Sequence, residues 1–327
     1  MAARATRSAS PRREEAVATG PLGALSHDEL GVIFDGLADP LQPVVAVALS
    51  STCLGLRTPL RAALAVLEER HARAVALLRK AGRYDAAADY FKGQVGLTCE
   101  EVRGFKGLNF SDDDLENFSD DGHLALDDIA TLGTIMPWLP KLRVLQVETH
   151  GLGPAGINAF LGCCGIMPSL IELRFSDDDE ELGPSRHPPS IAGALPRGAL
   201  PKLEKLGLHG CRLGNQGMAV LMPTLRKLPA LKTLYLGDND LGGEGFAPLV
   251  TGLDKDDFKA LTGLFLHGND LDDANCDTLA RSLSAGAFPM LKNKRLDTNE
   301  IVTLHDNSGA SAAALKSVMH VLDARGK

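Results

Sequence analysis

The chain has 327 residues, of which 44% are hydrophobic and 23% charged, and its formal net charge at pH 7 is −8. It is long enough to bury a large core, and it has no apolar run near the ~18 residues that a membrane span requires. Its negative charge offers no basic face to nucleic acid. We therefore expect neither a membrane nor nucleic acid as a partner.

The cysteines argue against a metal centre. The chain has six of them, and they form no CxxC pair. No histidine stands near them at the spacing of metal ligands. We expect buried thiols in a reducing compartment, with no metal and no cofactor.

Residues 1–20 are rich in Arg, Ala and Ser and lack the continuous apolar segment of a secretory signal. This composition predicts a disordered tail on a cytoplasmic or nuclear protein. Import into an organelle is the alternative, and Glu14 and Glu15 argue against it because transit peptides are poor in acidic residues.

Residues 21–58 predict a small all-α module. Ser26 as N-cap and Glu29 three residues later match a capping box at the start of its first helix. Pro40 and Pro43 end that helix, and a second begins at Val44. The first helix is marked by apolar residues at helical spacing, namely Leu25, Leu30, Ile33, Phe34 and Leu37.

The order of residues in this module resembles an F-box, the helical motif that docks on the Skp-type adaptor of cullin ubiquitin ligases. The module departs from the family's pattern at Ser26, where the family usually has proline, and at Leu56, near the place of a late tryptophan. The resemblance implies that the five apolar residues of the first helix bind the adaptor. The alternative is a helical cap that only covers the first repeat.

Residues 59–102 are expected to form a helical linker or cap. Its main helix is predicted over 59–81, with Pro59 at the start and Gly82 after the end.

Residues 103–327 contain a repeat of about thirty residues with the pattern L-x-x-L-x-L, in about seven copies. The copies are Phe105-Leu108-Phe110, Leu142-Leu145-Val147, Leu170-Leu173-Phe175, Leu203-Leu206-Leu208, Leu231-Leu234-Leu236, Leu261-Leu264-Leu266 and Leu291-Lys294-Leu296. An N/C-x-L step follows four of them, at Cys211-Leu213, Asn239-Leu241, Asn269-Leu271 and Asn299-Ile301. This position favours a side chain that can hydrogen-bond the backbone of the turn where the strand ends. Apolar residues at helical spacing come next, which predicts one strand and one helix per copy.

This pattern resembles the leucine-rich repeats of the ribonuclease-inhibitor type. The resemblance implies an α/β fold, a horseshoe-shaped solenoid with a parallel concave sheet and convex helices. Because side chains alternate along a strand, the residue between the second and third leucines must point into the hollow. That position holds Asn109, Gln146, Arg174, Gly207, Tyr235, Phe265 and Arg295, and the next outward position holds Ser111, Glu148, Ser176, His209, Gly237, His267 and Asp297.

The candidate partner-binding patch on the concave face consists of Tyr235, Phe265, His209, His267, Arg174 and Arg295. Aromatic and arginine residues among polar groups are typical of interface hot spots. The alternative is that the two aromatic rings only stack on each other and stabilise the sheet. His209 and His267 lie two strands apart, so we expect no shared metal ion.

The acidic stretches FSDDD at 110–114 and 175–179 fall where strands end. They do not match an EF-hand, and we expect solvated turns. Phosphorylation of Ser111 or Ser176 is a further hypothesis. Pro184, Pro188 and Pro189 predict an irregular loop on the convex side of the third repeat.

No P-loop, nucleophile elbow or HExxH motif is present, so we expect no enzyme. The first hypothesis is a monomeric adaptor that recruits a protein through the concave face and joins it to a cullin-type ligase through the Skp-type adaptor. The alternative is a scaffold or regulator unrelated to ubiquitin. GTPase activation belongs to that alternative and would depend on Arg174, Arg212 or Arg295.

Overall fold

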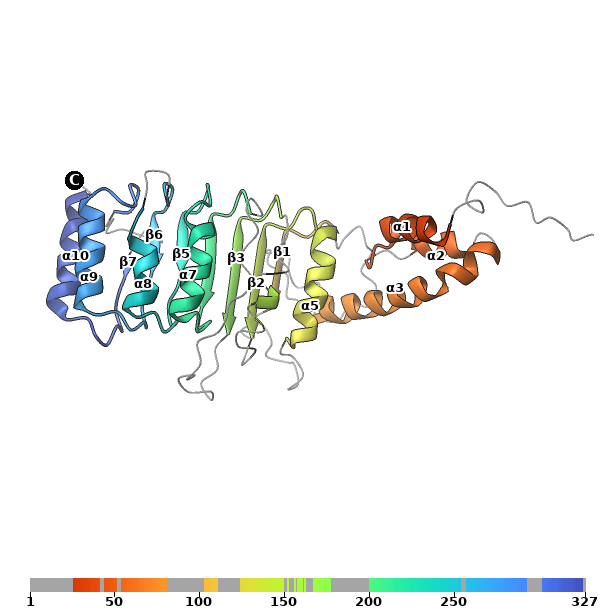
Figure 1. The fold of residues 1–327 in the computed structure, drawn as a ribbon, viewed down its shortest axis with the longest axis horizontal. Coiled ribbons are helices and arrows are strands. Elements are labelled where there is room, and N and C mark those ends of the chain that lie inside the picture. Colours follow the sequence, from red (N-terminus) through yellow and green to blue (C-terminus); the bar gives the residue numbers. More distant parts are fainter. Residues whose placement is uncertain are drawn as a thin grey trace, which may run out of the picture. The chain divides into compact units, whose positions relative to one another are not determined.

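The computed structural model describes residues 26–41, 44–51, 54–80, 103–110, 124–149, 152, 156, 158–160, 162, 167–177, 200–253, 257–292 and 302–325. The chain divides into two compact units, Met1–His71 and Ala72–Lys327 (Figure 1), which we call the N-terminal unit and the repeat unit. The predicted boundaries at residues 20 and 102 fall outside the described residues and stay predictions.

The N-terminal unit is helical, as the sequence predicts. Its helices are α1 (His27–Leu37), α2 (Val44–Ser51) and the first part of α3 (Leu54–Lys80). The predicted capping box is present, since Ser26 Oγ accepts from the Glu29 amide at 3.2 Å and the Glu29 carboxylate accepts from the Ser26 amide at 2.8 Å. The prediction that the long helix begins at Pro59 is wrong, because α3 already begins at Leu54.

A compact apolar cluster holds the N-terminal unit together. It consists of Leu30, Phe34, Ala46, Leu60 and Leu67. Two residues of the predicted adaptor-binding set are therefore core residues, with Leu30 4% and Phe34 1% exposed.

The other three adaptor-binding residues differ in their placement. Ile33 is half-buried, and Leu37 is 36% exposed at the end of α1. Leu25 lies outside the described residues.

The repeat unit contains one parallel sheet of seven strands in sequence order (Figure 1). This order arises because each coil places its strand beside the strand of the coil before it. The strands are β1 (Gly107–Phe110), β2 (Val144–Thr149), β3 (Glu172–Asp177), β4 (Lys205–His209), β5 (Thr233–Tyr235), β6 (Gly263–Phe265) and β7 (Val302–Thr303). Its described helices besides the end of α3 are α5 (Leu126–Ile135), η4 (Met136–Trp138), α7 (Gly214–Leu225), α8 (Gly243–Val250), α9 (Asp273–Ser284) and α10 (Ala312–Arg325).

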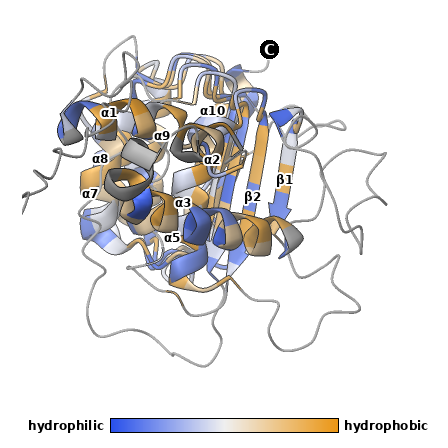
Figure 2. Ribbon diagram, turned by 90° about the vertical axis from the view of Figure 1, so that its right-hand side faces the viewer, coloured by the Kyte–Doolittle hydropathy of each residue, from blue (hydrophilic) through white to orange (hydrophobic). Residues whose placement is uncertain are grey.

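The helices of the repeat unit lie along one face of the sheet, and no described helix covers the other face (Figure 2). We call that uncovered side the open face; it is the side that the sequence predicts to be concave. Between the layers lie the repeat leucines, and Leu145, Leu173, Leu206, Leu234 and Leu264 are all fully buried. The predicted strand register is confirmed for the first six strands.

A ladder of asparagines fixes the turn after each of the later strands. The Asn239 Oδ1 atom accepts from the Leu213 amide at 3.3 Å, and its Nδ2 donates to Leu208 O and Gly237 O. Asn269 repeats this pattern one coil later, with its Oδ1 accepting from the amides of Asn239 and Leu241. The predicted role of the N/C-x-L step is thus confirmed for these coils, and each asparagine binds the turn of the coil before it.

Cys211 takes the place of asparagine in the fourth coil. Its thiol donates to Phe175 O at 3.4 Å and to His209 O at 3.3 Å. Burial, with a smaller contribution from Asp177, raises the pKa of the Cys211 thiol well above its ordinary value, so the thiol stays protonated. Cys211 and Cys276 are both buried and free, as expected.

The third coil corrects the expectation that every aspartate of the FSDDD stretch is solvated. Asp177, the last residue of β3, is only 6% exposed. Its Oδ1 accepts from Thr149 Oγ1 at 2.9 Å and from the Leu152 amide at 3.0 Å. The carboxylate therefore does for the second coil what the asparagines do for later ones. The remaining aspartates of the two stretches, Ser111 and the three prolines lie outside the described residues.

The seventh coil contradicts the predicted register. Leu291 is fully buried, as its place in the repeat requires. The strand, however, is β7, where Val302 pairs with Leu264 and Thr303 with Phe265. The turn asparagine is Asn307, whose Oδ1 accepts from the Leu271 amide at 3.1 Å, and the assignment of Asn299 is wrong.

No described helix is both long and apolar enough to cross a bilayer.

Candidate binding surface on the open face

The strand register builds two rows of side chains across the open face. The first row is Asn109, Gln146, Arg174, Gly207, Tyr235, Phe265 and Thr303. Beyond the strand ends, backbone bonds such as Asp238 N to His267 O and Gly268 N to His305 O continue the same register. The second row is therefore Glu148, Ser176, His209, Gly237, His267 and His305.

The predicted partner-binding residues are brought together, with one exception. Tyr235, Phe265, His209, His267 and Arg174 share the open face and are half-buried there. Arg295 lies outside the described residues, and the place predicted for it beside Phe265 is taken by Thr303. That a protein binds here stays a prediction.

Two aromatic rings form the centre of the first row. The rings of Tyr235 and Phe265 stack with their centroids 4.4 Å apart and their planes 22° from parallel. Stacking covers one side of each ring, so each residue is half-buried without any covering layer. The pair therefore stabilises the sheet and at the same time presents a flat apolar surface to solvent.

A guanidinium group extends this surface. Arg174 Cζ lies 5.3 Å from the centroid of the Tyr235 ring, across the intervening Gly207. Glu172 holds the arginine, with its Oε1 2.6 Å from Arg174 Nε, and its Oε2 lies 3.2 Å from Lys205 Nζ. A Cβ at residue 207 would lie 3.1 Å from Arg174 Cγ, so a larger residue there would require the arginine side chain to shift by a few tenths of an ångström.

The gap at Gly207 also leaves a hollow of about 240 Å³ beside the arginine. Its lining residues are Gln146, Glu148, Arg174, Phe175, Ser176, Gly207, His209 and Tyr235. Gln146 Nε2 donates to Glu148 Oε1 at 2.9 Å, so part of the polar wall is internally bonded. The hollow offers a small pocket for one side chain of a partner.

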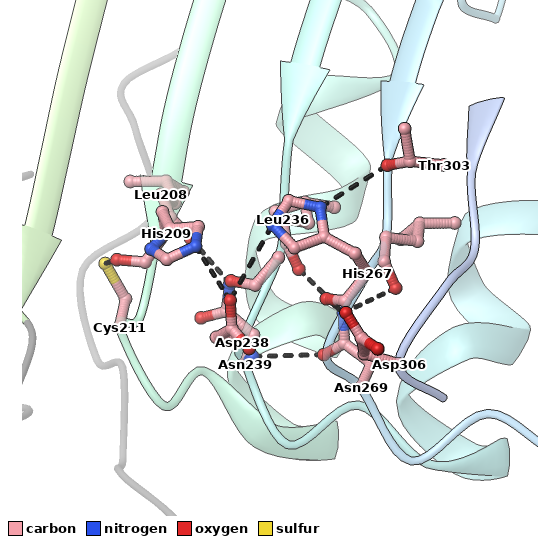
Figure 3. Close-up of polar contacts among 12 residues, drawn as sticks. Leu208, His209, Cys211, Leu236, Asp238, Asn239, His267, Asn269, Thr303 and Asp306 are labelled. Atoms are coloured by element: carbon pink, nitrogen blue, oxygen red, sulfur yellow. Dashed lines mark hydrogen bonds and ion pairs between the residues drawn. The ribbon is translucent and has the colours of Figure 1, made fainter. Parts of the chain in front are cut away.

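The second row carries a cluster of histidines around one carboxylate (Figure 3). His209 Nε2 lies 2.7 Å from Asp238 Oδ2, and His267 Nε2 lies 3.7 Å from the same oxygen. The centroids of the two imidazole rings are only 5.5 Å apart. The two residues were expected to be too far apart to share a ligand. That expectation is wrong, because Gly237 between them has no side chain and the His267 ring lies over it.

A third ring belongs to this cluster. The imidazole of His305 stacks on that of His267, with centroids 5.0 Å apart and an interplanar angle of 5°. Its Nε2 lies 3.6 Å from Asp306 Oδ2. Burial lowers the pKa of His267, and the neighbouring His209 and His305 lower it further, while Asp238 acts in the opposite direction.

Sequence reasoning missed Asp238, Glu172, Lys205 and His305. Glu172 and Lys205 occupy the outward position before the second leucine, which was not read as a row. Asp238 is in the left-handed backbone region, with φ 54°, which turns its side chain back over the open face. A signal was available, since an aspartate next to a glycine at a strand end often adopts that conformation.

Comparisons with known proteins agree with this architecture. No family model matches the chain. Over 167 residues, or 51% of the chain, it is 32% identical to a ribonuclease inhibitor of Sus scrofa and covers 35% of that protein. It is 28% identical over 153 residues to the ribonuclease inhibitor of Mus musculus, which is 47% of the chain and 32% of that protein.

A third similarity is to Protein NLRC5 of Mus musculus, with 31% identity over 113 residues, or 34% of the chain and 5% of that protein. The repeat unit is a leucine-rich-repeat solenoid. The chain spans about a third of the length of the ribonuclease inhibitors it matches. The F-box resemblance of the N-terminal unit stays a prediction.

Proposed function

We propose that the leucine-rich-repeat solenoid is a protein-binding module, not an enzyme, and that its partner docks on the open face around Tyr235, Phe265 and Arg174. The observation that carries this proposal is the stacked aromatic pair, which lies half-exposed on the open face with a guanidinium beside it. Aromatic and arginine side chains carry most of the binding energy in protein interfaces.

The surroundings of the aromatic pair support the same function. Arg174 and Lys205, both paired with the buried Glu172, provide positive charge at the edge of the surface, and the hollow beside Arg174 can receive a side chain. An apolar centre with a polar rim is the usual anatomy of a protein interface. The relatives named ribonuclease inhibitor add support, because their name gives a protein as their target.

The test uses the full chain and one matched control. Proteins captured from a cell extract are identified, purified and titrated against the wild type and against a chain carrying both Tyr235→Ala and Phe265→Ala. We expect the double substitution to weaken binding by more than about 2 kcal/mol, or roughly thirtyfold. The control is Val220→Ala, on the exposed side of α7, which should bind as the wild type does.

Equal affinities of the double variant and the wild type would contradict the proposal. Thermal unfolding separates a binding effect from misfolding, since both rings are on the surface and the sheet core beneath them is unchanged. Loss of the stacked pair costs the sheet about 1 kcal/mol, so we expect the melting temperature to fall by only a few degrees.

A second function is proposed for the N-terminal unit, namely docking on a Skp-type adaptor of a cullin ubiquitin ligase. The observation that favours it is a set of exposed apolar side chains on α1 and α2, with Val32 73%, Leu37 36%, Val45 50% and Val47 36% exposed. Leu30 and Phe34 would support this surface from within the core.

The adaptor test compares two substitutions in the same unit. Leu37→Asp should abolish binding of the full chain to purified adaptor, whereas Val66→Asp on α3, where the valine is 46% exposed, should not. If the wild-type chain does not bind the adaptor at micromolar concentration, this second function is refuted while the first is unaffected.

A further inference from the structure

The geometry points to a binding site for a transition-metal dication of the Zn²⁺ class on the open face, with His209 Nε2, His267 Nε2 and an Asp238 carboxylate oxygen as its ligands. The site goes beyond the proposed protein-binding function and does not depend on it.

The three ligand atoms are already close to the positions that a metal needs. All of them lie within 4.8 Å of one another. In a tetrahedral zinc site with bonds of about 2.0–2.1 Å, ligand atoms are about 3.4 Å apart. The distance from His267 Nε2 to Asp238 Oδ2 is 3.7 Å, and that from His209 Nε2 is 2.7 Å, the length of a hydrogen bond. Against about 3.4 Å, the two distances to Asp238 Oδ2 must change by about 0.7 Å and about 0.3 Å, and the two nitrogens must approach each other by at most about 1.4 Å. Shifts of this size are within the reach of side-chain rotations.

The backbone around the site holds these ligands in place. Asp238 is anchored by its amide, which donates to His267 O at 3.0 Å, and Asn239 next to it is fixed by the asparagine ladder. Glycines make the room. A Cβ at Gly237 would lie 2.5 Å from His267 Nε2, and one at Gly268 would overlap the Asp238 carboxylate. Both glycines thus leave space that the two ligand side chains occupy.

An outer partner orients one of the imidazoles. His267 Nδ1 lies 3.4 Å from Thr303 Oγ1 (Figure 3). When Nδ1–H donates to that hydroxyl, the lone pair of Nε2 faces Asp238, which is the tautomer that a metal requires.

The donor set selects the class of ion. Two imidazole nitrogens and one carboxylate suit Zn²⁺, Co²⁺, Ni²⁺ or Cu²⁺, whereas Mg²⁺ and Ca²⁺ prefer oxygen ligands alone. Binding forms a bond from the Nε2 lone pair of His209 to the metal, so the proton shared with Asp238 must leave that nitrogen. In a neutral ring the proton moves to Nδ1, and in a protonated ring one proton is released to solvent. His209 is 43% and Asp238 48% exposed, so the ion can enter from solvent and keep water as a further ligand.

The test titrates ZnCl₂ into the untagged full chain by calorimetry, with MgCl₂ and CaCl₂ as control ions. We expect Zn²⁺ to bind and the control ions not to bind. The substitutions His209→Gln and His267→Gln should each lower the affinity for Zn²⁺ at least about tenfold. Even the loss of a residue that only supports a metal ligand costs that much. The control His320→Gln removes an exposed histidine of α10, in the helical layer, and should leave the affinity unchanged.

Asp238→Asn provides a variant whose fold is preserved, because asparagine also tolerates the left-handed backbone at this position. This variant should also lower the affinity for Zn²⁺ at least about tenfold, because the anionic ligand is lost. Bound CoCl₂ should in addition give the visible absorption of a tetrahedral ion in the wild type and not in this variant. Failure of the wild type to bind Zn²⁺, or binding by Asp238→Asn and His209→Gln that equals the wild type, would overturn the inference.

Discussion

Replacing Asn269 by alanine tests whether the asparagine ladder stabilises the solenoid. Asn269 is 3% exposed, and its Oδ1 accepts from the amides of Asn239 at 3.0 Å and Leu241 at 3.1 Å. Its Nδ2 donates to Leu236 O at 2.8 Å and to two further carbonyl groups. The substitution leaves two buried N–H groups with no acceptor in a turn that water does not reach.

The expected loss follows from these contacts. A buried donor without a partner costs about 1–3 kcal/mol, so two of them cost about 2–6 kcal/mol. We expect a decrease of about 4 kcal/mol in the free energy of unfolding, a large part of the roughly 5–15 kcal/mol that a domain has. Urea unfolding followed by circular dichroism measures it. A pronounced early transition would show that the coils on either side of Asn269 open first, since repeats couple mainly to their neighbours.

Two further substitutions sharpen this test. Asp270→Ala changes the next residue of the same turn, which is exposed, and should cost less than about 0.5 kcal/mol. Asn269→Asp keeps the acceptor but turns a carboxylate oxygen toward carbonyl groups. Burial raises the pKa of such a carboxyl, so this variant should regain stability as the pH falls. A loss below about 1 kcal/mol for Asn269→Ala, or an equal loss for Asp270→Ala, would refute the reasoning.

Three other outcomes are expected. Gly207→Val should fill the hollow and push Arg174 off the tyrosine ring. We expect this change to weaken partner binding at least about tenfold in the titration described above. An unchanged affinity would show that the partner does not use the hollow. Arg325→Ala should lower the free energy of unfolding by about 2 kcal/mol. The reason is that the guanidinium donates to Phe288 O at 2.9 Å and to Ala287 O at 2.8 Å, just after the preceding helix. An unchanged melting temperature would contradict this expectation. Because the pKa of Cys211 is raised, the native state keeps a thiol proton that the unfolded chain loses at high pH. The free energy of unfolding should therefore fall as the pH rises above about 8.5. Cys211→Ala should make this fall smaller when urea unfolding is measured at several pH values.

Most of the fold could be predicted from the sequence because the repeat pattern places the strand and the core residues of each coil within a short stretch of chain. In the first six coils each second leucine is a fully buried or nearly buried residue, and the strand register follows from counting. The seventh coil broke the rule through an insertion between Leu291 and its strand. Leu296 and Asn299 happened to fit the spacing, whereas Leu304 and Asn307 are the residues whose burial and hydrogen bonds match the earlier coils.

The histidine cluster could not be predicted by counting. Its residues come from four different coils, and the distance between His209 and His267 was judged from the spacing of strands alone. The real separation depends on where each side chain points, which in turn depends on the absence of a side chain at Gly237 and on the left-handed backbone of Asp238. Such contacts involve several coils at once, and a repeat pattern contains no information about them.

The two glycines of the open face have a consequence for how such a protein can change. Where every strand of a row carries a side chain, each residue contacts its immediate neighbours, as Tyr235 and Phe265 do. At Gly207 and Gly237 the neighbouring coils meet across a missing side chain, so Arg174 depends on Tyr235 and His209 on His267. Swapping a single coil would therefore preserve the scaffold but break these contacts, so a redesign of this face should exchange three adjacent coils together.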